Sequence, residues 1–156
     1  MSIAQSQKPE PNGRRGLSRA APVRVLVVED FVPYRQFTCS TLARLRGLQI
    51  VGEVSDGLEA IQKAVELHPD LIVLDIGLPS LNGIETARQI CKLVPEAKII
   101  FLTQESSSDV VQLAISLGAR GYVVKNKAGT DLVAAVEAVL SGMRFVSSPH
   151  ALDNLS

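Results

Sequence analysis

Asp70-Leu-Ile-Val-Leu-Asp-Ile-Gly-Leu-Pro-Ser-Leu-Asn-Gly83 is the stretch of sequence that decides the fold. Its run from Leu71 to Leu74 is entirely apolar, as expected of a parallel strand buried on both faces. Asn82 precedes Glu85 by three residues, which matches a polar N-cap followed by an acid in the first helical turn. The stretch therefore predicts a strand, a loop and a helix, which form one unit of an α/β sheet.

The same alternation of short apolar runs and helical spacing occurs five times after Pro22. Glycines that suit a helix end follow the last two helices, at Gly118 and Gly142. Short connections with right-handed crossovers then predict a five-stranded, doubly wound parallel sheet of the flavodoxin-like order 2-1-3-4-5. The predicted strands are Val23–Val28, Gln49–Val54, Asp70–Leu74, Lys98–Leu102 and Gly121–Val124.

Each predicted helix carries one apolar stripe that should face the sheet. We expect residues 23–142 to form the folded domain and residues 143–156 to form a C-terminal tail or linker remnant. Residues 1–22 contain too few large apolar groups to offset the entropy of ordering them, so we expect a disordered leader. The first two stripes comprise Tyr34, Phe37, Thr38, Thr41, Leu42 and Leu45, and then Ile61, Ala64 and Val65.

The composition argues against several classes of function. The 16 basic and 16 acidic residues cancel, which disfavours a dedicated nucleic-acid or membrane-surface binder. The sequence has neither a signal-peptide core nor an apolar run of roughly 20 residues, so we expect a cytoplasmic protein. Cys39 and Cys91 lack metal-ligand or disulfide-framework spacing, and we interpret both as small apolar side chains in helices.

Five polar residues directly follow predicted strands: Glu29, Asp30, Asp75, Thr103 and Lys125. In open α/β sheets, ligands bind beyond the carboxyl ends of the strands, where the winding direction reverses. Three carboxylates placed there would repel one another and attract a hard divalent cation, for which Mg²⁺ is the best match. A metal, a lysine, a hydroxyl and a carboxylate nucleophile suit phosphoryl transfer, with Asp75 as the acceptor.

Each of these residues also has an ordinary structural interpretation. An acid after a strand often caps a helix, a threonine often serves as a turn hydroxyl, and a lysine is usually a surface charge. The occurrence of all five at strand ends favours the functional interpretation, because unpaired buried carboxylates would be costly.

The motifs resemble those of the receiver domain of two-component response regulators, between about Val23 and Gly142. They are Val27-Val28-Glu29-Asp30, Leu74-Asp75-Ile-Gly-Leu-Pro79-Ser-Leu-Asn-Gly83, Phe101-Leu-Thr103 and Gly121-Tyr122-Val-Val-Lys125. The resemblance implies that Asp75 accepts a phosphoryl group from a histidine of a sensor kinase, from a phosphotransfer protein or from a small donor.

The resemblance also implies roles for the other motif residues. Asp30, Asp75 and the Gly77 carbonyl would bind Mg²⁺, and Glu29 would act through water. Thr103 and Lys125 would contact the phosphoryl oxygens. An inward movement of Thr103 would make room for the ring of Tyr122 and so reshape the surface of the fourth helix, fifth strand and fifth helix.

Some positions depart from the family pattern or leave an expectation open. Gln104 follows the threonine where a small residue is usual, and Asn126 follows the lysine where proline is common. In this family, the positions of Gly77 and Glu105 influence how quickly the phosphoaspartate hydrolyses, so the sequence leaves that lifetime open.

The C-terminal part resembles receivers that continue into a helix-turn-helix domain. The residues after Gly142 are too few for such a DNA reader, so we expect no direct DNA binding by this chain and a downstream protein partner instead. A homodimer is expected to use either the surface of the fourth helix, fifth strand and fifth helix, or the first and fifth helices.

Two other functions remain open from the sequence. A magnesium-dependent phosphohydrolase acting through an aspartyl phosphate usually has a second acid two residues after the nucleophile, where this chain has Gly77. A nucleotide- or flavin-binding module on the same fold would need a glycine-rich turn after the first strand, where Glu-Asp-Phe-Val-Pro-Tyr stands instead.

Overall fold

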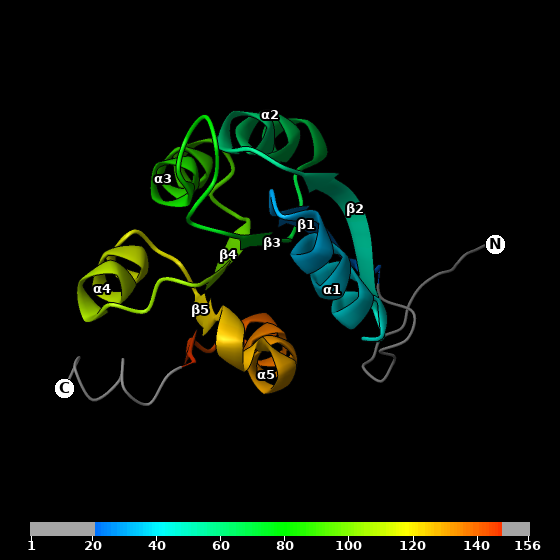
Figure 1. Ribbon diagram of the computed structural model, residues 1–156. Coiled ribbons are helices and arrows are strands. Elements are labelled where there is room, and N and C mark those ends of the chain that lie inside the picture. The colour runs from blue at the N-terminus through cyan, green and yellow to red at the C-terminus, as the bar shows by residue number, and fades with distance from the viewer. Residues whose placement is uncertain (1–20, 148–156) are drawn as a thin grey trace.

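A parallel sheet flanked by helices on both faces forms the structure, a computed structural model that describes residues 21–147 (Figure 1). The sheet order is β2-β1-β3-β4-β5-β6, and every neighbouring pair of strands is parallel. The strands are β1 (Val23–Val28), β2 (Leu48–Val54), β3 (Leu71–Leu74), β4 (Lys98–Thr103), β5 (Gly121–Val124) and β6 (Phe145–Val146). The helices are α1 (Val32–Ala43), α2 (Gly57–Leu67), α3 (Gly83–Leu93), α4 (Ser108–Ser116), the 3-10 helix η2 (Lys125–Lys127) and α5 (Ala128–Leu140).

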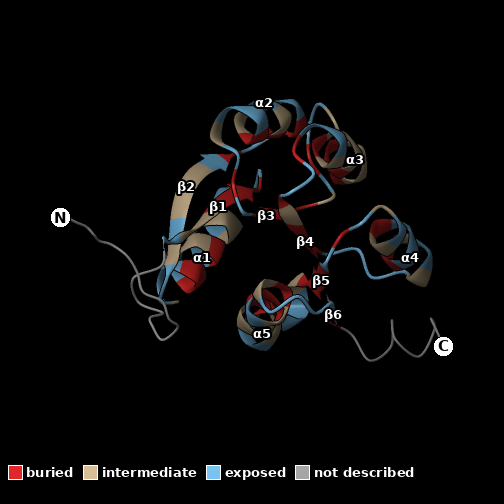
Figure 2. Ribbon diagram, turned by 180° about the vertical axis from the view of Figure 1, so that it is seen from behind, coloured by how far each residue is buried: buried red, intermediate tan, exposed pale blue. Residues whose placement is uncertain are grey.

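Two apolar cores lie between the sheet and the helices, one on each face of the sheet. Leu26 and Val28 of β1 contribute to a core that also contains residues of α2, α3 and α4, whereas Val25 and Val27 contribute to the core shared with α1 and α5. Burying each such side chain stabilises the fold by roughly 1.5–3 kcal/mol. Figure 2 accordingly shows buried residues gathered on the central strands and exposed residues on the outer sides of the helices.

The predicted fold class is confirmed, and the predicted strand order holds for β1 to β5. The prediction of five strands is wrong by one, because a sixth strand lies in the segment predicted as a tail or linker remnant. The amide of Phe145 donates to the carbonyl of Arg120 at 3.1 Å, and the amide of Ser147 donates to the carbonyl of Tyr122 at 2.8 Å. A strand of two residues is too short to show the alternation that identifies longer strands.

The signals for helix starts and stops are confirmed. The side chain of Asp56 accepts a hydrogen bond from the amide of Glu59 at 2.8 Å, and that of Asn82 accepts one from the amide of Glu85 at 3.0 Å. Beyond α4 and α5, Gly118 and Gly142 have φ values of 108° and 87°, in the left-handed region that favours glycine.

Three details of the helical stripes are wrong. Phe37 and Val65, predicted to be buried, are 39% and 45% exposed. Each lies one residue from the centre of its buried stripe, at Thr38 and Ala64, and a step of one residue turns the side chain about 100° away from the core. The first helix also ends at Ala43 rather than including Leu45, which packs against the core from the following turn.

The remaining expectations about the fold concern cysteines, membranes and termini. Cys39 and Cys91 are free, half-buried and packed against the two cores, in agreement with their interpretation as apolar side chains. No helix within residues 21–147 has the length and apolar character needed to cross a membrane. Most of the predicted leader, residues 1–20, and the last part of the predicted tail, residues 148–156, lie outside the described residues.

Candidate functional site

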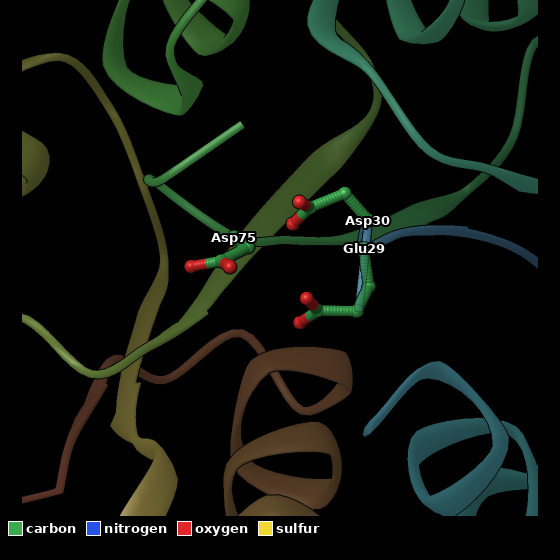
Figure 3. Close-up of side chains that lie close together, drawn as sticks. All are labelled: Glu29, Asp30 and Asp75. Carbon is green, nitrogen blue, oxygen red and sulfur yellow. The ribbon is translucent and has the colours of Figure 1, made fainter. Parts of the chain in front are cut away.

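Three acidic side chains meet at the carboxyl ends of β1 and β3. Glu29 and Asp30 directly follow β1, and Asp75 directly follows β3. One carboxylate oxygen from each residue lies within 4.8 Å of those of the other two. Figure 3 shows the three side chains close together. Glu29 and Asp75 are buried and Asp30 is exposed, so the cluster opens toward solvent on the side of Asp30.

Lys125, which directly follows β5, brings a positive charge to this cluster. Its Nζ lies 2.8 Å from Glu29 Oε1 and 3.2 Å from Asp75 Oδ2. Thr103 and Gly77 line the same cleft, together with Gln104. The structure therefore brings together in one cleft the residues that the strand-end rule selected, although the segments that carry them are distant in the chain.

The Asp75 carboxylate is fixed by the backbone that follows it. Its Oδ1 accepts hydrogen bonds from the amides of Ile76 and Gly77, at 2.7 and 3.4 Å. Its Oδ2 faces the ammonium of Lys125. Because both oxygens are held by donors, the carboxylate presents a defined orientation to the cleft rather than rotating freely.

The electrostatics of the cleft leave negative charge in excess. Burial raises the pKa of Glu29, and the charge of Asp75 adds to this effect, although the hydrogen bonds from Lys125 and from the amide of Phe31 oppose it. Burial alone would lower the pKa of Lys125, but its hydrogen bond to Glu29 and the charge of Asp75 outweigh burial, and the pKa is raised. One ammonium thus pairs with two of the three clustered carboxylates.

This donor set fits a small divalent cation. Three clustered carboxylates with one exposed member provide oxygen ligands and leave room for bound water, which matches the preference of Mg²⁺. Gly77 lines the cleft beside them and has a backbone carbonyl to offer.

Thr103 and Tyr122 are joined through the backbone of one residue in the loop between β4 and α4. The Thr103 Oγ1 accepts a hydrogen bond from the amide of Glu105 at 3.3 Å, and the hydroxyl of Tyr122 donates to the carbonyl of Glu105 at 2.6 Å. The Tyr122 side chain is fully buried, and its ring centroid lies 6.1 Å from that of Phe101. A change at Thr103 can therefore reach the tyrosine through a single peptide segment.

Three residues that contact the site were not predicted from the sequence. The amide of Phe31 donates to Glu29 Oε2 at 3.1 Å, and Arg35 donates to the Glu29 carbonyl at 2.8 Å. The ring of Tyr34 lies against the ammonium of Lys125, with 4.5 Å between Nζ and the ring centroid. Their position at the start of the helix after the acidic pair was the available signal, since the start of that helix has to face the same end of the sheet.

Residues 25–137 match the response regulator receiver domain family. The chain belongs to this family. Its acidic cluster and its lysine therefore lie in the cleft of a receiver.

Related receivers occur in bacterial regulatory proteins. Response regulator GacA of Pseudomonas viridiflava is 33% identical over 125 residues, which cover 80% of this chain and 58% of GacA. Transcriptional regulatory protein PdtaR of Mycobacterium tuberculosis (strain H37Rv) is 39% identical over 132 residues, which cover 83% of this chain and 62% of PdtaR. The receiver thus spans less than two thirds of the length of these relatives.

Solved receiver structures have the same fold. A two-component response regulator of the LuxR family from Aurantimonas has a TM-score of 0.79 and 33% identity, with 85% of this chain and 94% of that chain covered. The response regulator domain of Thermotoga maritima CheB has a TM-score of 0.69 and 29% identity, with 74% and 94% covered. These similarities confirm the flavodoxin-like receiver fold.

Proposed function

We propose that Asp75 accepts a phosphoryl group from a phosphohistidine of a sensor kinase or phosphotransfer protein, or from a small acyl phosphate. The observation that carries this proposal is the position of its oriented carboxylate, between an acidic pair and a lysine in the cleft of a receiver. A kinase that makes its phosphohistidine from ATP is a cytoplasmic donor, and the proposed reaction takes place in that compartment.

The proposed reaction breaks one bond to phosphorus and forms another. A carboxylate oxygen of Asp75 attacks the phosphorus atom, and the bond from phosphorus to the donor atom breaks. That atom, the nitrogen of a phosphohistidine or the carboxylate oxygen of an acyl phosphate, retains the electron pair. Lys125, whose Nζ already lies 3.2 Å from Asp75 Oδ2, would then contact a phosphoryl oxygen together with the Thr103 hydroxyl. This transfer depends mainly on positioning and on neutralising oxygen charge.

We assign Asp30, Asp75 and the Gly77 carbonyl as ligands for Mg²⁺, with Glu29 acting through water. When bound, the ion would offset the charge of the carboxylates and of the incoming phosphoryl oxygens. The excess of three carboxylates over one ammonium supports this assignment.

The signal would leave the receiver through a conformational switch. Phosphoryl contact would draw Thr103 inward, and the bridge through Glu105 to Tyr122 would pass the change to the surface of α4, β5 and α5. A ligand or modification shifts such an equilibrium only when it favours one of two states, and the phosphoryl group would do so by its contact with Thr103. The recipient would be a partner protein or a second copy, docked on this surface or on α1 and α5.

Incubation with acetyl phosphate and Mg²⁺ followed by intact-protein mass spectrometry tests the acceptor. We expect the mass gain of one phosphoryl group, its loss in Asp75→Asn, and its loss when a chelator removes the metal. Glu66→Gln is the matched control, because this carboxylate lies on α2 outside the cleft and forms only an exposed ion pair with Lys63. A modified Asp75→Asn chain would show that another residue is the acceptor.

A phosphohydrolase acting through an aspartyl phosphate usually has a second acid two residues after the nucleophile. This chain has Gly77 at that position, which argues against the competing function. The relatives reported above are response regulators, which signal rather than turn over substrates. Phosphate release from a small ester, in amounts far above one equivalent of protein, would favour the phosphohydrolase.

A further inference from the structure

Tyr34 contacts Lys125 in two ways, although 91 residues separate them in the chain. Its ring lies 4.5 Å from the Lys125 ammonium, and its hydroxyl donates to the Lys125 backbone carbonyl at 3.1 Å. The ring is thus directed at the charged end of the lysine and the hydroxyl at its main chain. A single side chain of α1 therefore contacts both the backbone and the ammonium group of this lysine.

The ammonium of Lys125 stands between two adjoining hollows. The first is the acidic cleft with Asp75, and the second is lined by Tyr34, Ser106 and Asn126. Lys125 lines both, whereas Tyr34 lines only the second. The Tyr34 ring therefore contacts the lysine from outside the acidic cleft.

The lysine needs such a neighbour because it is largely withdrawn from water. Its side chain is only 11% exposed, so its charge is stabilised by Glu29, by Asp75 and by the aromatic face. Once a phosphoryl group engages the lysine, its contacts with the two carboxylates must loosen. The ring contact can persist through that exchange, because Tyr34 does not line the cleft that the phosphoryl group would enter.

The tyrosine itself is supported from α1. Its ring centroid lies 5.2 Å from that of Phe37, which is three residues further along the same helix. Burial, with the charges of Glu29 and Asp75, raises the pKa of Tyr34 to about 12, so the hydroxyl stays protonated and keeps its donor role.

We propose that Tyr34 is a positioning residue for phosphoryl capture, acting through Lys125 by keeping its ammonium on the acceptor side. This inference rests on the proposed function of Asp75, and it goes beyond it by assigning a role to a residue outside the acidic cleft. The proposal predicts that loss of the ring weakens binding of a phosphoryl analogue more than loss of the hydroxyl does. It also predicts that loss of the ring leaves Mg²⁺ affinity nearly unchanged.

Beryllofluoride, a phosphoryl analogue, and Mg²⁺ are the two probes, titrated separately by calorimetry against the same variants. Tyr34→Leu should weaken beryllofluoride affinity at saturating Mg²⁺ by about fivefold, the size of one partly buried cation–π contact, and change Mg²⁺ affinity less than about twofold, within ordinary context effects. Tyr34→Phe keeps the ring and should retain most of the beryllofluoride affinity. Gln36→Leu, an exposed change on α1 lining neither hollow, is the control and should alter neither affinity.

A double-mutant cycle makes the test specific. In a Lys125→Met background, Tyr34→Leu should have no further effect on beryllofluoride affinity, because no cation is left to position. Should the leucine variant not fold, Tyr34→Met takes its place.

Three outcomes would overturn the role of Tyr34: equal losses in the leucine and phenylalanine variants, a parallel loss of Mg²⁺ affinity, or an undiminished effect without the lysine. Failure of the unmodified chain to bind beryllofluoride, or equal binding by Asp75→Asn, would instead contradict the proposed acceptor.

Discussion

Gly83 allows the start of α3 to touch the backbone that carries Asp75. A Cβ at this position would collide with the carbonyl oxygen of Asp75 and with the Cα of Ile76. The Gly83 amide also donates to the Ile76 carbonyl at 2.7 Å. At Gly77, in the same loop, a Cβ would meet nothing within 4 Å. One glycine is therefore required by close packing, and the other is not.

We expect Gly83→Ala to reduce the free energy of unfolding by about 1–3 kcal/mol, since the backbone of the acceptor loop has to move to admit a methyl group. Gly77→Ala should leave stability within roughly 0.5 kcal/mol of the parent, as for most surface substitutions. Urea denaturation followed by circular dichroism measures both. Because alanine is otherwise the better helix former, a more stable Gly83→Ala chain would show that the loop relaxes easily.

At the scale of elements, Ser147 adds a side-chain hydrogen bond to the backbone pairing of β6 with β5. Ser147 is buried, its amide bonds to the carbonyl of Tyr122, and its hydroxyl donates to Asp131 Oδ2 in the first turn of α5. The two strand residues pair with β5, and Phe145 and Val146 each pack against one of the two cores. The hydrogen bond to the carboxylate therefore adds to the contacts that keep β6 beside β5.

Ser147→Ala should loosen β6 while leaving the rest of the sheet intact. A lost hydrogen bond to a partly exposed carboxylate corresponds to about 1 kcal/mol, so the amides of Phe145 and Ser147 should exchange hydrogen roughly fivefold faster. Ser141→Ala is the matched control, because that hydroxyl is exposed and donates within α5, to Glu137. Unchanged exchange in Ser147→Ala would mean that strand pairing alone holds β6.

Elements with strong local signals could be predicted from the sequence, and those that depend on tertiary contact could not. The caps at Asp56 and Asn82 act within four residues, so their pattern is visible in the chain. β6 has no local pattern, and Phe37 looks apolar whether it faces the core or another ring. The strand-end rule found the acidic cluster and Lys125, but Tyr34 contacts the site from a helix, where no comparable rule applies.

At the scale of the whole molecule, the tyrosines report alkaline unfolding. The chain has two tyrosines and no tryptophan. Burial, helped by Glu29 and Asp75, raises the pKa of Tyr34 from 10.0 to about 12, and burial also raises the pKa of Tyr122. The folded chain therefore keeps phenolic protons that the unfolded chain loses above pH 10. Their contribution to stability is complete below pH 10 and is lost as the pH rises through the folded values.

Absorbance at 295 nm, where tyrosinate absorbs, should consequently stay flat through pH 10 in buffer and then rise together with the loss of circular dichroism. In concentrated urea, both phenols should titrate near the ordinary value of 10. The raised pKa of Lys125 acts in the same direction, since its ion pairs are lost as the pH rises above 10.5. A separate tyrosinate step near pH 10 in the folded chain would show that one phenol is open to water.

The charge excess of the cleft predicts that Asp30→Asn changes stability in opposite directions with and without metal. In a chelator, removing one of three neighbouring carboxylates relieves repulsion, so the variant should melt at a higher temperature than the parent. With Mg²⁺ at about 100 times its dissociation constant, the parent should gain about 2.7 kcal/mol. The variant, lacking a ligand, should gain little, and the order of the two melting temperatures should reverse.

Glu66→Gln, outside the cleft, should respond to Mg²⁺ as the parent does. Because unfolding without metal and unfolding with metal are measured on the same two proteins, a non-specific effect of salt cannot produce the reversal. An equal gain in Asp30→Asn would place the metal elsewhere.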